Sequence, residues 1–220
     1  QKHLQEAHSH FAFYGWITNV LYVLIVHYIS KVNPLVKLRK YEYLIVINLA
    51  ASFAMLGTFI YGGYFWASIV ASTTALLASF VFCYFFVVDA RKIQDTSKIW
   101  FLAGLFFAVI SSVGVFNLAY MMSSKNINQD LYLASEYYFL HFQYNGFFIF
   151  SCIGLLLYSL KEAGSPINDK TNRLMFWLSF FGCLVGVELS LLWLKMPLWV
   201  FTLIVVATIG QTVAAVMLFG

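Results

Sequence analysis

Charged side chains are scarce in this sequence. Only 10% of its 220 residues are Asp, Glu, Lys or Arg, whereas 62% are apolar and 20% are aromatic. A soluble domain needs roughly a quarter of its residues to be charged to cover its surface. Together with a mean hydropathy of +0.82, this scarcity excludes an ordinary soluble fold and predicts that a lipid bilayer is the main solvent of the chain.

Patterns typical of several soluble activities are also missing. The net charge is only +4, and no run of Lys or Arg is interleaved with exposed aromatics, so we expect no nucleic-acid partner. A catalytic triad, a phosphate-binding glycine loop and a dinucleotide fingerprint do not occur. The three cysteines lie in apolar segments without a CxxC pattern, and we expect them to be small core residues: Cys83, Cys152 and Cys183.

Long apolar runs predict an all-α fold, a polytopic bundle of about seven transmembrane helices. A bilayer core of roughly 30 Å requires about 20 helical residues, and seven such runs are separated by charged or turn-forming segments. We expect them to form a single transmembrane domain over residues 1–220. The predicted helices cover residues 9–30, 41–61, 64–88, 99–122, 134–160, 174–194 and 197–219.

Basic residues favour alternate loops. Ten Lys or Arg residues follow helices one, three and five, and three lie on the other side. Because basic loops stay in the cytoplasm, we expect the N-terminus to lie outside. We also expect the membrane to be a bacterial inner (plasma) membrane. Aromatic residues near the predicted helix ends fit interfacial belts of lipid anchors: Tyr41, Tyr43, Tyr64, Trp66, Trp100, Trp193 and Trp199.

One short motif occurs twice. Residues 10–16 read HFAFYGW and residues 141–147 read HFQYNGF, so both fit H-F-x-[FY]-x-G-[WF]. The offset of 131 residues equals four predicted helices, a four-helix pseudo-repeat, so both copies run in one direction. Their histidines, His10 and His141, then lie at one depth near the outer leaflet. We expect the two imidazoles to face a common pocket and to hold a heme from opposite sides.

Other residues of the motif are candidate heme contacts. The glycines would let a bulky ring or another helix approach the backbone closely. The tyrosines would supply flat walls. These candidates are Gly15, Gly146, Tyr14 and Tyr144.

Two further residues are candidates for metal binding or proton transfer. His8 lies about 200° around the helix from His10, so we expect it at the outer surface, unless a non-helical N-terminal segment turns it inward. Glu188 lies about 9 Å from the outer end of helix six, where a carboxylate is a functional candidate. A glutamate that only fixes helix packing is the alternative. We expect most of the other polar residues inside helices to join helices: Asn19, Asn48, Asn117, Gln143, Asn145, Thr208, Gln211 and Thr212.

The segment from His8 to Trp16 resembles the H-x-H-x-x-x-x-G-W opening of short bacterial relatives of heme-copper oxidase subunit I. It is also similar to the H-x-H-E-x-x-x-G-F segment of the NnrS family. The resemblance implies repeated four-helix units, with one helix upstream of Gln1. His10 would then correspond to a low-spin heme ligand and His141 to a copper ligand. The next predicted helix lacks the family's adjacent pair of histidines, so this chain does not encode a complete heme-copper centre.

The sequence is compatible with three functions. The leading hypothesis is a heme-binding membrane protein resembling heme-copper oxidase subunit I. It would act in respiration, electron transfer or the handling of oxygen and nitric oxide, with other respiratory subunits or a cytochrome as partners. A zinc-dependent membrane hydrolase would use His8, His10, His141 and Glu188, whereas copper lacks a full ligand set. A cofactor-free transporter or scaffold would use the histidines for packing. The chain is either a complete small protein or a fragment of a longer subunit.

Overall fold

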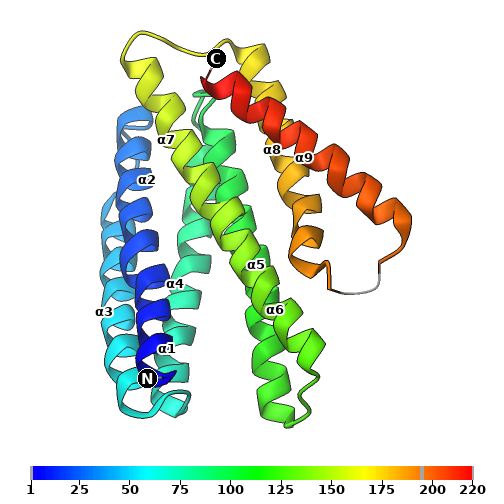
Figure 1. Ribbon diagram of the computed structural model, residues 1–220. Coiled ribbons are helices and arrows are strands. Elements are labelled where there is room, and N and C mark those ends of the chain that lie inside the picture. Colours follow the sequence, from blue (N-terminus) through cyan, green and yellow to red (C-terminus); the bar gives the residue numbers. More distant parts are fainter. Residues whose placement is uncertain (1, 194–195, 220) are drawn as a thin grey trace. The chain divides into compact units, whose positions relative to one another are not determined.

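The computed structural model describes residues 2–193 and 196–219, and helices make up most of them (Figure 1). No strand occurs within these two ranges. They contain seven helices that are long and apolar enough to cross a membrane. The all-α, seven-span fold is therefore confirmed, and the chain is an integral membrane protein. The outside location of the N-terminus stays a prediction.

The first compact unit, Gln1–Asp95, holds three of the spans. Its first span is built from three consecutive segments, α1 (Lys2–His10), the π-helix η1 (Phe11–Thr18) and α2 (Asn19–Val32). The second span, α3 (Arg39–Gly62), packs against α1 and η1, and the third, α4 (Trp66–Ala90), packs against α3. Thus α3 is the central helix of this unit.

The second compact unit, Thr96–Gly220, holds the other four spans. Its first helix is α5 (Lys98–Ser124). The next span repeats the segmented pattern, with α6 (Gln129–His141), the π-helix η2 (Phe142–Phe148) and α7 (Ile149–Glu162). All three of these segments pack against α5. Whether the two units form the single domain expected from the sequence stays a prediction.

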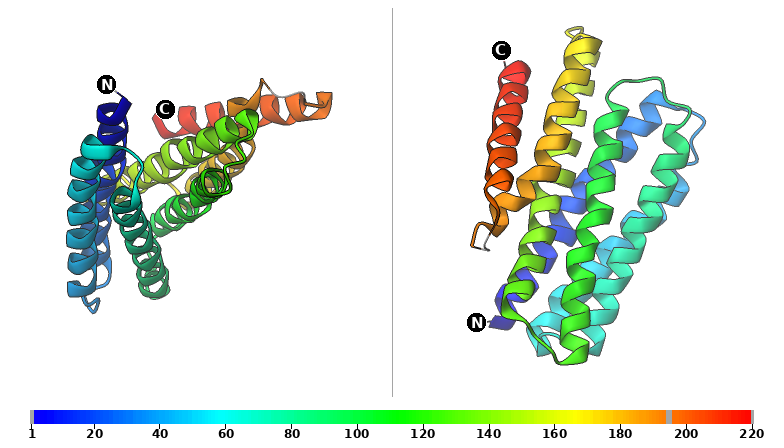
Figure 2. Two further views of the ribbon diagram at one scale, coloured as in Figure 1. Left: turned by 90° about the horizontal axis from the view of Figure 1, so that it is seen from below. Right: turned by 90° about the vertical axis from the view of Figure 1, so that its right-hand side faces the viewer.

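The second unit ends in a helix pair. The helix α8 (Asp169–Gly186) tightens into the 3₁₀-helix η3 (Val187–Leu191), and α9 (Leu198–Phe219) completes the described chain. Figure 2 shows α9 alongside α8, and these two helices pack against each other. The segment η3 packs against α6, so α8 and η3 together contact the span that carries His141.

Helix boundaries repeat between the units. The two π-helices begin at Phe11 and Phe142, 131 residues apart, which is the offset of the sequence motif. Spans one to three of the chain therefore correspond to spans five to seven. The helix α5 has no counterpart among the described residues of the first unit. The other corresponding helix starts are Arg39 with Asp169 and Trp66 with Leu198.

Turn residues explain several helix ends. Gly63 ends α3 with φ +62°, a conformation that glycine adopts without strain. Asn168 caps α8, because its Oδ1 accepts the N–H of Lys170 at 2.8 Å. That cap starts α8 at Asp169 rather than at residue 174, so the predicted boundary was wrong there. The predicted helix end at Leu194 and the basic residue Lys195 lie outside the described residues.

Burial corrects three expectations drawn from residue type. Trp100 and Tyr41 were expected as lipid anchors, but both are 0% exposed. Trp100 donates from Nε1 to Asn172 Oδ1 at 2.8 Å, and the Tyr41 hydroxyl donates to Asp89 Oδ2 at 2.8 Å. Their polar atoms have partners inside the protein, so they do not need the membrane interface. Cys152 is exposed rather than in the core, whereas the other two cysteines are buried as expected.

Candidate functional site

Each motif histidine ends an α-helix and is followed directly by a π-helix. His10 ends α1 and precedes η1, and His141 ends α6 and precedes η2. Short π-helical segments are rare and are often found at functional sites. The sequence pattern did not predict these two π-helices. The repeated motif was the one signal that marked both positions.

His10 uses one ring nitrogen in a local hydrogen bond. Its Nδ1 lies 2.8 Å from the carbonyl oxygen of Glu6. Because a carbonyl only accepts, Nδ1 carries the proton and donates. The neutral ring then keeps a lone pair on Nε2, which has no hydrogen-bond partner within residues 2–193 and 196–219. Metal-binding histidines commonly have this arrangement, with one N–H held by a carbonyl and the other nitrogen available.

Aromatic contacts fix the orientation of the His10 ring. It stacks on Phe59 of α3 with ring centroids 4.2 Å apart and an angle of 25° between the planes. The ring of Tyr64 meets it edge-on at 5.9 Å. Phe59 is fully buried, so the stacking surface is itself held by packing. The imidazole is thus half-buried and positioned on two sides.

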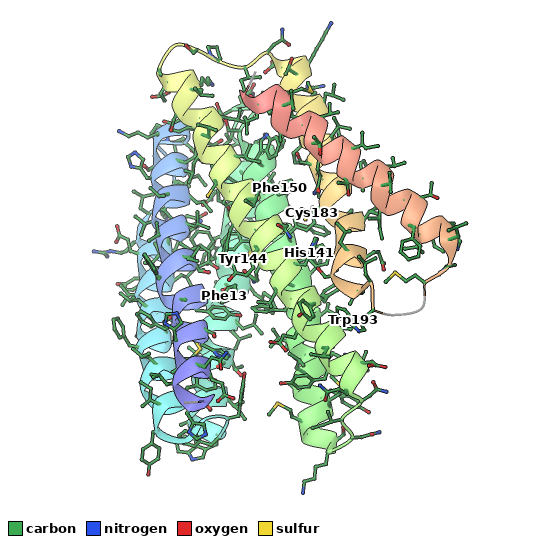
Figure 3. The ribbon with its side chains drawn as sticks, viewed as in Figure 1. Phe13, His141, Tyr144, Phe150, Cys183 and Trp193 are labelled. Carbon is green, nitrogen blue, oxygen red and sulfur yellow. The ribbon has the colours of Figure 1, made fainter. Side chains whose placement is uncertain are left out.

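His141 has both ring nitrogens in hydrogen bonds. Nε2 lies 2.8 Å from the carbonyl oxygen of Cys183, and Nδ1 lies 3.2 Å from Nδ2 of Asn145. The carbonyl requires that Nε2 donate, so Nδ1 accepts from the Asn145 amide. Figure 3 shows His141 beside Cys183. A metal could bind this imidazole only after one of the two hydrogen bonds is broken.

The change of helix type in the sixth span supplies the carbonyl that His141 uses. After Gly186 the helix tightens to η3, and the N–H of Val187 bonds to the carbonyl of Val185. The Cys183 carbonyl is therefore available to a side chain. A Cβ at Gly186 would lie 3.3 Å from Cε1 of His141, so the absence of a side chain there lets the ring approach α8.

The motif glycines leave space for neighbouring side chains of their own units. A Cβ at Gly15 would lie 2.8 Å from ring atoms of Phe11 and 2.9 Å from Cβ of Ser52 on α3. A Cβ at Gly146 would collide with Phe107 of α5. Both glycines thus permit close helix packing. Contact with heme stays a prediction for them.

The remaining predicted site residues differ in their surroundings. Tyr14 packs against the apolar cluster that contains Ala7, Met55 and Phe59, whereas Tyr144 is 47% exposed. His8 is exposed while His10 is half-buried, as the helical spacing predicted.

The four expected zinc ligands are divided between the two compact units. Within either unit, no three His, Cys, Asp or Glu side chains of the described residues come together. His8 and His10 belong to the first unit, whereas His141 and Glu188 belong to the second. Glu188 is half-buried in η3, and the part of the chain that the structure describes gives it no hydrogen bond or ion pair.

Two asparagine amides hold the end of η1. The backbone N–H of Asn19 bonds to the carbonyl of Trp16. The side-chain amides of Asn19 and Asn48 both donate to the carbonyl of Tyr14, at 3.0 and 2.8 Å. Asn48 therefore joins α3 to η1, as expected of a buried polar residue.

Other polar residues confirm that expectation only in part. Asn117 donates to Ser135 of α6, and Gln143 donates to Ser111 of α5, so both link neighbouring helices. Thr208 and Thr212 instead donate to carbonyls of their own helix, so their hydroxyls do not join helices.

The fold and the site together define an integral membrane protein with seven spans and two elements in which a histidine precedes a π-helix. No family model, no curated protein and no solved structure matches the chain.

Proposed function

We propose that this chain is a heme-binding protein of the bacterial inner membrane that serves electron transfer or the handling of oxygen or nitric oxide, with His10 as an axial ligand. The observation that carries the proposal is the hydrogen bond from His10 Nδ1 to the Glu6 carbonyl. It leaves the Nε2 lone pair for iron and fixes the ring orientation, as second-shell partners of metal-binding histidines do. Phe59 stacks on the face of the imidazole and helps to hold it in this orientation.

The two histidines fit a heme to different degrees. His10 can offer Nε2 without losing a hydrogen bond in the described chain, whereas His141 would lose a bond to Cys183 or to Asn145. The chemistry that a bound heme supplies depends on its ligands: two histidines favour electron transfer, and one histidine leaves a position for a gas. The contacts of His141 favour ligation by His10 alone, with gas handling as the better supported activity.

A partner is required for the electron-transfer branch of this proposal. Another respiratory subunit or a cytochrome would deliver electrons to the heme. The alternative function is a cofactor-free scaffold or transporter, which the saturated hydrogen bonding of His141 favours. We do not propose a zinc hydrolase, because neither unit by itself brings three metal ligands together among the described residues.

An absorption spectrum of the purified protein tests the proposal. The protein is expressed with ample heme and measured in its oxidised and reduced forms. We expect a Soret band between about 400 and 430 nm, lost in His10→Ala and kept in His141→Ala. His27→Ala is the matched control, because His27 is an exposed histidine of the same span. A wild-type protein that stays colourless would overturn the proposal and support a cofactor-free role.

A further inference from the structure

Two buried amide oxygens in the first unit have no partner among the described residues. They are Oδ1 of Asn19 and Oδ1 of Asn48, whose side chains are 7% and 0% exposed. Both amides point their Nδ2 groups at the carbonyl of Tyr14. The two side chains therefore converge at the end of η1, one from the first span and one from α3.

The orientation of these amides is fixed by their partners. The Tyr14 carbonyl is an acceptor, so each asparagine must turn its NH₂ group toward it. Exchanging the amide oxygen and nitrogen would place two acceptors against each other. A second hydrogen bond fixes the Asn19 amide in the same orientation, because its Nδ2 also donates to the carbonyl of Gly15 at 3.1 Å. Both Oδ1 atoms thus remain as acceptors, and buried acceptors in proteins are nearly always satisfied.

The amide pair belongs to the first unit alone. At the offset of 131 residues, Phe150 and Ser179 stand where the first unit has Asn19 and Asn48. At the end of η2, the N–H of Ile149 donates to the carbonyls of Gly146 and Tyr144. Neither Phe150 nor Ser179 carries an amide, so the end of η2 has no counterpart of the Asn19 and Asn48 pair. The pair is a specific feature of η1 rather than a general requirement of the repeated element.

We propose that Asn19 and Asn48 bind one small hydrogen-bond donor, a buried water molecule that donates one hydrogen to each amide oxygen. The two O–H groups of water match the two unsatisfied acceptors. The groups bonded to these amides are neutral backbone carbonyls. An unpaired cation would be costly in such surroundings. This site links η1 to α3, and it does not depend on heme binding.

Proton-detected solid-state NMR on the whole protein in phosphatidylcholine bilayers tests the water site. We expect cross-peaks at the water frequency on the side-chain amide groups of Asn19 and Asn48. Asn19 is assigned without a variant, since it is the only asparagine followed by valine. The methyl group of Met55, 0% exposed on the same α3 helix, is the dry control. The absence of the Asn19 and Asn48 cross-peaks in the wild-type protein would overturn the proposal.

A variant and a change of salt sharpen this test. Asn48→Leu should remove the water cross-peak from Asn19, whereas Asn117→Leu, at an asparagine bonded to Ser135, should leave it. If Asn48→Leu fails to fold, the presence or absence of the wild-type cross-peaks still tests the water site. Thermal unfolding in sodium chloride and in choline chloride of equal ionic strength should give the same midpoint. A midpoint that sodium raises in the wild-type protein, but not in Asn48→Leu, would show that a cation binds there in place of the water. That result would overturn the proposal.

Discussion

His10 and His141 occupy the same place in two copies of one motif, yet their rings bind different partners. His10 donates from Nδ1 to a carbonyl of its own helix and stacks on Phe59 of α3. His141 donates from Nε2 to Cys183 on α8 and accepts from Asn145. The ring of His10 meets an aromatic side chain of α3, whereas the ring of His141 meets a carbonyl of α8. The motif places the histidines, and the partner carbonyl decides which nitrogen carries the proton: one of its own helix for His10 and one of α8 for His141.

The largest loss of unfolding free energy is expected from changes at the motif glycines. Both copies of the motif pack closely at this position. Gly146→Ala places a Cβ against Phe107, and overpacking of this kind costs about 1–3 kcal/mol of unfolding free energy. Gly15→Ala should also be destabilising but should cost less, because a Cβ there lies less close to its neighbours, Phe11 and Ser52, than a Cβ at Gly146 lies to Phe107. Thermal unfolding in detergent measures both. Gly57→Ala, where a Cβ meets nothing within 4 Å, is the control. A loss at Gly57 equal to that at Gly146 would contradict the packing role.

The second effect separates the two histidines. His141→Phe removes the donor to the buried Cys183 carbonyl, and an unsatisfied buried acceptor costs about 1–3 kcal/mol. His10→Phe should cost less, because the stacking on Phe59 is kept and the Glu6 carbonyl belongs to a helix. Thermal unfolding of the heme-free protein measures the order. A larger loss of stability in His10→Phe than in His141→Phe would contradict this prediction.

The smallest effect concerns a hydroxyl of the second unit. Ser151 Oγ is buried without a partner in the described part of the chain. Ser151→Ala should therefore be neutral or stabilise the protein by up to ~1 kcal/mol. Ser111→Ala is the matched change, at a hydroxyl that accepts from Gln143 and donates to the carbonyl of Ala108. It should be destabilising under the same thermal assay. Equal losses at both serines would show that Ser151 has a partner.

The spans were predictable from the sequence because the bilayer sets a length that apolar runs reveal directly. The motif histidines could be chosen as candidate site residues from the sequence because ionisable residues are rare inside spans. Their role as ligands stays a prediction. The two π-helices were not predicted, and the end of η1 depends on Asn48 from another helix. The buried positions of Trp100 and Tyr41 were also missed. Their polar partners, Asn172 and Asp89, lie far away in the sequence.

The tautomers of the two histidines test the account most directly. Nitrogen-15 NMR of the heme-free protein, with His10→Gln and His141→Gln for assignment, reports which ring nitrogen carries the proton. The account predicts opposite neutral tautomers, with the proton on Nδ1 in His10 and on Nε2 in His141. The same tautomer at both positions would contradict it.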